Sequence, residues 1–271
     1  MKRSDAIVVA MTNFLIANGA LAQTLEIVDD IPGTFIDISI TGGTPLQLGS
    51  DDEVGVGSFT GSFALQPGLL VVANNGGLGF GTKVVTDLQP DNQPIPSNNA
   101  FGGGQALLAF WDDIDDDIDD KNGDVFFAQF VMEDNIMTIV QWNDLPVGSN
   151  PDDIVTFQIQ ICENLDPAGV YAQFIYKDVE QLAANGGASA TIGYQDGGAG
   201  FGDVEWSFNE ANAVSNGTVL SLVIREPHAE HVPTLSDWGI VILTLLLLTA
   251  ATIIFGRQRY RPSESGDSNS M

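Results

Sequence analysis

A dense group of carboxylates is the clearest candidate for chemistry in this sequence. The stretch WDDIDDDIDDKNGD, from Trp111 to Asp124, holds eight aspartates in fourteen residues. Carboxylates this close together repel one another, and Ca²⁺ is a cation that binds carboxylate oxygens. The candidate calcium ligands are Asp113, Asp115, Asp117, Asp119 and Asp124.

The spacing of these acids does not fit an EF-hand loop. That loop needs alternating acids, a glycine at its sixth position and a glutamate at its twelfth. Counted from Asp113 the sixth residue is Ile118, and counted from Asp115 it is Asp120. Two interpretations therefore stay open: a Ca²⁺ site of another kind, and a solvated acidic loop that closes on the turn KNGD.

The remaining motifs do not predict an enzyme. GGLGFGTK (76–83) resembles a phosphate-binding loop in its glycine spacing, but Thr82 and Lys83 stand in the reverse of the required order. His228 and His231 are the only histidines, and both follow the region predicted to fold as β structure, so no Ser-His-Asp triad is expected there. The single cysteine excludes zinc clusters and intrachain disulfides. A hydrolase that uses paired carboxylates is the alternative to a non-enzymatic protein.

The charge of the chain excludes one class of partner. It carries 36 acidic and 9 basic side chains. Residues 23–230 keep 32 acids (36 − 1 − 3) and 4 bases (9 − 5), a net charge of −28. Nucleic acid is not expected as a partner, because a polyanion would be repelled by this domain.

The N-terminus has the pattern of a secretory signal peptide. Lys2 and Arg3 precede the apolar stretch 6–16, and ALA at 20–22 places small residues at a cleavage site. We expect residues 1–22 to be removed after Ala22, so that the following domain is exported.

The exported region is predicted to be β structure throughout. In segment 154–162 the residues Val155, Phe157, Ile159 and Ile161 alternate with polar ones, which is the period of a half-buried strand. Further candidate strands are 34–40, 68–73, 106–111, 124–131, 136–142, 170–177, 188–194 and 218–225. Short strands with Gly and Asn at their turns favour an antiparallel β-sandwich. We therefore expect an all-β ectodomain at 23–226, with one long loop at 89–104.

The C-terminal part reads as one transmembrane helix in a short module. Residues 240–255 contain no charge, and with their flanks they predict a membrane-spanning helix at 239–256. The basic residues after it should stay cytoplasmic; they are Arg257, Arg259 and Arg261. A linker is expected at 227–231 and a polar cytoplasmic tail at 262–271.

The residues VPTLSDWG that precede this helix resemble the signature of a known family. With the helix and the arginines, the module at 232–261 is similar to the IPTL-type C-terminal sorting domain of Gram-negative bacteria, a relative of PEP-type signals. Val232 and Asp237 are mild departures from that pattern. The signature residues are Val232, Pro233, Thr234, Leu235, Ser236, Asp237, Trp238 and Gly239. The resemblance implies processing by an exosortase-like membrane enzyme, a transient stay in the inner membrane, and transfer to the cell surface or extracellular matrix.

The second half of the ectodomain carries another resemblance. Segments such as ALLAFWDDID, GDVFFAQF and TIVQWNDLPV follow one another, over about residues 98–224, as in nidogen-like bacterial surface domains. Such domains are structural or adhesive modules without known catalysis. The resemblance implies a non-enzymatic surface or matrix protein whose partners are matrix polysaccharide or surface proteins. The alternative is a Ca²⁺-dependent binding module that uses the Asp-rich loop; no other cofactor is expected.

Overall fold

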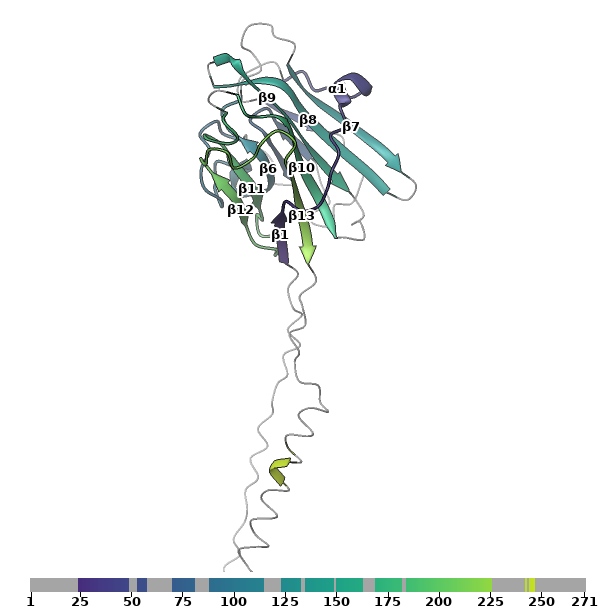
Figure 1. Cartoon of the computed structure of the whole chain (residues 1–271), viewed down its shortest axis with the longest axis vertical. Coiled ribbons are helices and arrows are strands. Elements are labelled where there is room, and N and C mark those ends of the chain that lie inside the picture. The colour runs from purple at the N-terminus through teal and green to yellow at the C-terminus, as the bar shows by residue number, and fades with distance from the viewer. Residues whose placement is uncertain are drawn as a thin grey trace, which may run out of the picture. The chain divides into compact units, whose positions relative to one another are not determined.

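The structure is a computed structural model that divides into two compact units, Met1–Pro227 and His228–Met271. The residues described are 24–48, 53–57, 70–80, 88–114, 123–132, 135–148, 150–162, 169–181, 184–225, 242 and 244–246. The first unit, called the β domain below, contains two antiparallel sheets and very little helix (Figure 1).

Sheet A has seven strands in the order β1-β13-β10-β9-β8-β7-β2. Their bounds are β1 Thr24–Val28, β2 Thr44–Pro45, β7 Asp124–Met132, β8 Asn135–Val147, β9 Asn150–Cys162, β10 Val170–Asp178 and β13 Val219–Arg225. Sheet B has six strands in the order β12-β11-β6-β5-β4-β3. Their bounds are β3 Val54–Gly57, β4 Leu70–Ala73, β5 Gly77–Phe80, β6 Gln105–Trp111, β11 Thr191–Gln195 and β12 Val204–Phe208.

The main core lies between the two sheets. The alternation predicted for β9 is confirmed, because its apolar residues from Val155 to Ile161 all belong to this core. Phe157 of β9 stacks on Trp142 with 4.9 Å between the ring centroids and lies 5.7 Å from Phe110 of sheet B. Trp142 Nε1 also donates a hydrogen bond to the carbonyl of Ala73, at 3.0 Å, which joins sheet A to sheet B. The all-β, two-sheet fold expected from the sequence is thus confirmed.

Part of the other face of sheet A is buried as well. We expected the polar side of β9 to face solvent, but Gln158 is fully buried under the crossing segment, residues 34–41. Gln158 accepts a hydrogen bond from the Ile36 N–H and donates one to the Ile36 carbonyl, each at 3.2 Å. Gln160 donates to the Thr34 carbonyl at 2.8 Å, and Ile38 N–H donates to Gln141 at 2.9 Å. The crossing segment is therefore held on the sheet by hydrogen bonds to side-chain amides of β8 and β9, not by strand pairing.

This arrangement corrects one sequence prediction. Residues 34–40 were expected to form a strand, but they run without strand pairing into the short helix α1, Ile38–Thr41. Apolar residues spaced two apart have the period of a strand, but this segment lies on the outer face of sheet A and does not pair with any of its strands. The predicted strand at 188–194 is also shorter, because β11 begins only at Thr191.

The predicted long loop covers the outer face of sheet B. Residues 88–104, which include the 3-10 turn η1 at Phe101–Gly103, form a second core with sheet B. The glycines of β5 make this possible: a Cβ on Gly79 would lie 2.7 Å from the Phe101 ring, and one on Gly77 would lie 2.8 Å from Leu88. The glycine-rich stretch at 76–80 is therefore a strand and turn that admits the loop.

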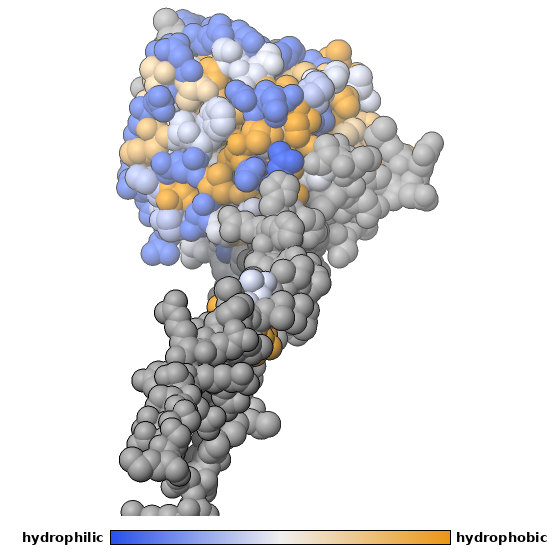
Figure 2. All heavy atoms as spheres, turned by 60° about the horizontal axis from the view of Figure 1, so that its bottom comes forward, coloured by the Kyte–Doolittle hydropathy of each residue, from blue (hydrophilic) through white to orange (hydrophobic). Residues whose placement is uncertain are grey.

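The two ends of the β domain leave it side by side. β1 and β13 are neighbours, with Thr24 opposite Arg225, and both ends lie at the same side of the β domain in Figure 1. Arg225 also forms an ion pair with Glu26 at 3.5 Å. Figure 2 shows the β domain with this end brought toward the viewer, and a patch of hydrophobic residues lies there among hydrophilic ones.

The predicted transmembrane helix at 239–256 falls almost wholly outside the residues that the structure describes. Ile242 and residues 244–246 are helical, with exposed side chains. Within the described part of the chain, no helix has the length and apolarity to cross a membrane.

Candidate functional site

The Asp-rich loop starts from a defined position at one end of the sandwich. Ile114 forms a β-bridge with Val147, and Gly148 N–H donates to the Asp113 carbonyl at 2.6 Å. The loop thus leaves sheet B beside the hairpin that joins β8 to β9. Asp113 is exposed there. The candidate ligands Asp115, Asp117 and Asp119 lie outside the described residues.

Asp112 is a buried acid at the start of this stretch. Only 5% of the residue is exposed, where it follows the buried end of β6. Its carboxylate accepts hydrogen bonds from Ser189 Oγ at 2.5 Å and from the Asp113 N–H at 2.9 Å. Burial raises the pKa of Asp112, and the charges of Asp113 and Asp153 act in the same direction against these hydrogen bonds.

Asp153 is a second buried acid at this end of the sandwich. It lies in β9 with no exposed surface and accepts from the Ala184 N–H at 3.2 and 3.4 Å. Our choice of candidate ligands omitted both Asp112 and Asp153. The signal for Asp112 was its place directly after a predicted buried strand, whereas no sequence pattern marked Asp153 as its neighbour.

Asp124 is the other predicted ligand that the structure describes. It is the first residue of β7, opposite Asn143, and its carboxylate accepts from the Val125 N–H at 2.7 Å. Burial raises its pKa, opposed by hydrogen bonds from the backbone of Val125 and Gln47. No group of three or more acids, His or Cys suited to a metal occurs among the described residues, so Asp113 and Asp124 do not by themselves make a centre there.

The topology places Ile114 and Asp124, which flank the Asp-rich loop, at the end of the β domain opposite its two ends. Strands alternate in direction from β13 to β7, so β9 and β7 run in the same direction as β13. Their first residues, Asn150 and Asp124, therefore lie away from Arg225. We call the end with Thr24 and Arg225 the terminal end, and the opposite one the distal end.

A second acidic turn uses its carboxylates for its own backbone. In DGGAGFGD (196–203), Asp196 accepts from the N–H groups of Gly200 and Phe201, both at 2.9 Å. Asp203 in turn accepts from the Asp196 N–H at 2.8 Å. These bonds satisfy amides of a glycine-rich turn whose Gly197, like others in it, has positive φ.

The predicted sorting residues cannot be placed in the fold. The signature 232–239 and the arginines Arg257, Arg259 and Arg261 all lie outside the described residues. The comparisons with known proteins concern the β domain instead. A sequence model of the family described as NIDO related matches residues 28–233. This match confirms the nidogen-like resemblance and extends it beyond 98–224 to include β2, β3, β4 and β5. Neither the curated proteins nor the solved structures contain a significant match to the chain.

Proposed function

The chain belongs to the NIDO-related family, and on that premise we propose that it is a non-enzymatic protein of the cell surface or extracellular matrix. Its β domain acts as an adhesive or structural module. Membership of this family is consistent with an extracellular role, and the partners we propose are matrix polysaccharide or other surface proteins.

The observation that carries this proposal is the placement of the two ends. Thr24 and Arg225 are neighbours on β1 and β13, while the Asp-rich loop leaves sheet B at the distal end. A tether at residues 226–231 would therefore hold the domain by its terminal end and leave the distal end facing outward. Adhesive loops at the end of a rigid sandwich are a common use of such a scaffold.

We further propose that residues 232–261 act as a sorting module. The signature would be recognised by an exosortase-like enzyme in the inner membrane, and the helix at 239–256 would be a transient anchor. Support comes from the order of signature, apolar run and arginines in the sequence. The exported β domain would then reach the surface or matrix of a Gram-negative cell.

Cell fractionation and an adhesion assay test this function together. The full chain should be recovered in the surface fraction, and cells that produce it should be retained on a coat of their own extracellular matrix. A chain ending at Glu230 should be exported but lost from the surface fraction, and its cells should not be retained. Surface recovery of the shortened chain would contradict the sorting role; equal retention of both cell types would contradict the adhesive role.

A second candidate function is Ca²⁺-dependent binding at the distal end. Burial is the main cause of the raised pKa of Asp112, and the charges of Asp113 and Asp153 add a repulsion that a cation would relieve. Asp115, Asp117 and Asp119 would supply the remaining oxygens, and Asp124 follows them at the start of β7. Ca²⁺ would hold the loop in one conformation for ligand contact.

Thermal unfolding of the full chain in detergent, with CaCl₂ and then with excess chelator, tests this site. Chelator should lower the Tm by several degrees, and Asp115→Asn with Asp117→Asn should abolish the difference. The exposed pair Asp29 and Asp30 offers a matched control, because the same double change there removes two charges away from the loop. A Tm that is the same with CaCl₂ and with chelator would contradict the Ca²⁺ site and favour a solvated acidic loop.

A further inference from the structure

The strand that leads into the C-terminal tether lies inside sheet A and not at its edge. β13 is second in the strand order, with β1 on one side and β10 on the other. It pairs antiparallel with β1 at five positions and with β10 at five. Its Leu220, Leu222 and Ile224 also pack in the main core between the sheets. The tether is therefore attached to a strand that is held by both neighbours and by the core.

The direction of β13 decides how a pull on the tether would load these contacts. β13 begins at Val219, toward the distal end, and ends at Arg225 at the terminal end. In an antiparallel pair the hydrogen bonds lie perpendicular to the strands. A pull along β13 would therefore strain all the bonds of a ladder together. A pull across the strands would open the ladder one pair at a time, starting from its end.

Force that enters at the distal end would act along β13. Gly148 lies there, in the hairpin between β8 and β9. β9 starts at this hairpin and runs in the same direction as β13, with only β10 between them. A pull that enters at Gly148 and leaves through Arg225 draws β9 and β13 apart along their length. The ladders of β10 are then loaded in shear.

Force between the two ends of the β domain would act across the strands instead. Thr24 and Arg225 are opposite each other, at the terminal end of β1 and β13. A pull on these two residues would first open their own pair and then the pair of Leu25 and Ile224. The exposed ion pair of Arg225 with Glu26, at 3.5 Å, adds little resistance. The same strand is therefore weak in one direction and strong in the other.

The chain that follows β1 keeps β1 from sliding along with β13. It leaves β1 toward the distal end and crosses the outer face of sheet A. Gln173 of β10 donates to the Pro32 carbonyl at 3.3 Å, and Gln160 of β9 donates to the Thr34 carbonyl at 2.8 Å. Gln158 then binds both backbone groups of Ile36. Because β1 is fixed in this way, a pull on β13 must shear its ladder with β1 as well as its ladder with β10.

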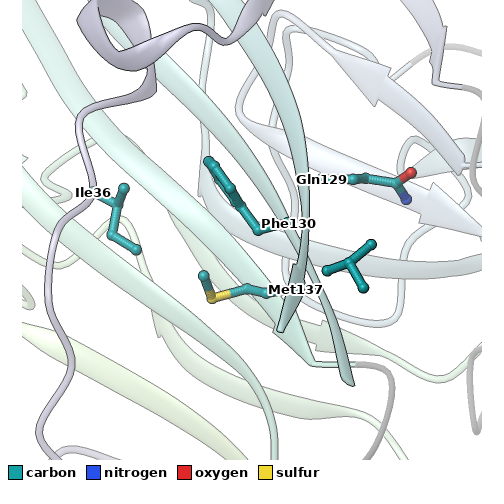
Figure 3. A pocket seen from close by; sticks show the side chains of 5 residues that line it. Ile36, Gln129, Phe130 and Met137 are labelled. Carbon is teal, nitrogen blue, oxygen red and sulfur yellow. The ribbon is translucent and has the colours of Figure 1, made fainter. Parts of the chain in front are cut away.

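Hydrogen bonds are the main hold at the far side of this crossing. Ile36 lines an apolar pocket of about 420 Å³ together with Phe130 and Met137 of the β7–β8 hairpin (Figure 3). The side chain of Ile36 is thus only partly packed against the sheet, whereas its backbone is bound by Gln158. Removing the Gln158 amide should therefore loosen β1 more than any change of apolar contact at this pocket.

We propose that β13 is a mechanical clamp, which resists force passed from the distal end to the tether by shear of its ladders with β1 and β10, while the crossing segment holds β1 in place. That force takes this direction rests on the proposed adhesive function. The difference in strength between the two directions does not, because it follows from the register alone.

Single-molecule force spectroscopy of the full chain in detergent tests the clamp. One handle is the C-terminus, and the other is a thiol at Thr24→Cys or at Gly148→Cys, where no atom lies within 4 Å of an added Cβ. Cys162→Ser removes the single native thiol from both forms. At equal loading rate, the first unfolding force should be at least about twofold higher from position 148 than from position 24, because shear breaks a ladder as a whole.

Two glutamine variants separate the clamp from general stability. Gln158→Leu loosens β1 and should lower the force from position 148 by at least about a fifth, with no change from position 24. Gln195→Leu is the matched control. Gln195 is also a buried glutamine, but it binds the carbonyls of Ala100 and Gly104 and so holds a loop on sheet B. Its replacement should leave both forces unchanged, and circular dichroism establishes that each variant folds.

Equal forces from positions 24 and 148 would overturn the clamp. A force from position 148 that Gln158→Leu leaves unchanged, or that Gln195→Leu lowers as much, would overturn the part assigned to the crossing segment. These measurements use the protein without a ligand. A failed clamp therefore leaves the adhesion assay unaffected, and a failed adhesion assay leaves these forces unaffected.

Discussion

The crossing segment offers a quantitative test of how sheet A is completed. Gln158→Leu keeps a side chain of similar volume in a fully buried position but removes three hydrogen bonds. Two of these bonds satisfy the N–H and carbonyl of Ile36, and the third comes from Gln160. At about 1 kcal/mol for each bond the loss is about 3 kcal/mol. Leucine recovers about 1 kcal/mol by apolar burial, so we expect the free energy of unfolding to fall by about 2 kcal/mol.

Urea unfolding of the full chain in detergent, followed by tryptophan fluorescence, measures this change. Hydrogen exchange adds a local measurement: the Ile36 amide should exchange about 30-fold faster, the equivalent of about 2 kcal/mol. Gln129→Leu is the matched control, because it removes a glutamine of the same sheet whose hydrogen bond, at 3.2 Å, goes to Thr138 of β8 and not to the crossing segment. A loss under about 0.5 kcal/mol with unchanged exchange at Ile36 would refute the view that glutamine amides hold the segment.

Three further predictions follow from the same structure. Burial acts to raise the pKa of Asp37, but hydrogen bonds from Ser39, Gln141 and Lys177 and the charge of Lys177 together lower it to about 2. The charged Asp37 therefore stabilises the fold above about pH 4, and this stabilisation is lost as the pH falls through 2. Asp37→Asn should therefore cost about 1 kcal/mol at pH 7, after discounting for partial exposure, and much less at pH 2, as urea unfolding at both pH values would measure. Burial raises the pKa of Asp112, so the protonated carboxyl is favoured in the folded protein and this stability is lost as the pH rises through that raised value. Asp112→Asn removes the buried charge and should therefore raise the Tm at pH 7 in chelator; an unchanged Tm would argue that the buried charge does not destabilise the fold. Gly79→Val should lower the free energy of unfolding by about 1–3 kcal/mol, because its added Cβ would collide with the Phe101 ring. Gly198→Val is the comparison: no atom lies within 4 Å of an added Cβ there, so any loss of stability comes from the positive φ of the backbone.

Periodicity and turn chemistry were sufficient to predict much of the fold. The strand at 154–162 could be read from its alternation, because one face of β9 packs on the opposite sheet and needs apolar residues. The segments at 106–111 and 124–131 were likewise found within a residue of their bounds. The short strands β3 and β12 were not predicted, since four or five residues with glycine or polar neighbours carry too little pattern.

The sequence by itself determined that the chain is a strongly acidic, all-β protein with candidate export and sorting segments, because charge and side-chain alternation are local properties. Only the tertiary structure decided what covers each sheet. Residues 34–40 have the alternation of a strand but bind the amides of Gln158 and Gln160, which are distant in sequence. The Phe101 ring explains the glycine at position 79 of β5, and Asp153 comes near enough to raise the pKa of Asp112 only in the folded chain. Long-range packing sets these relations, and no window of sequence contains both partners.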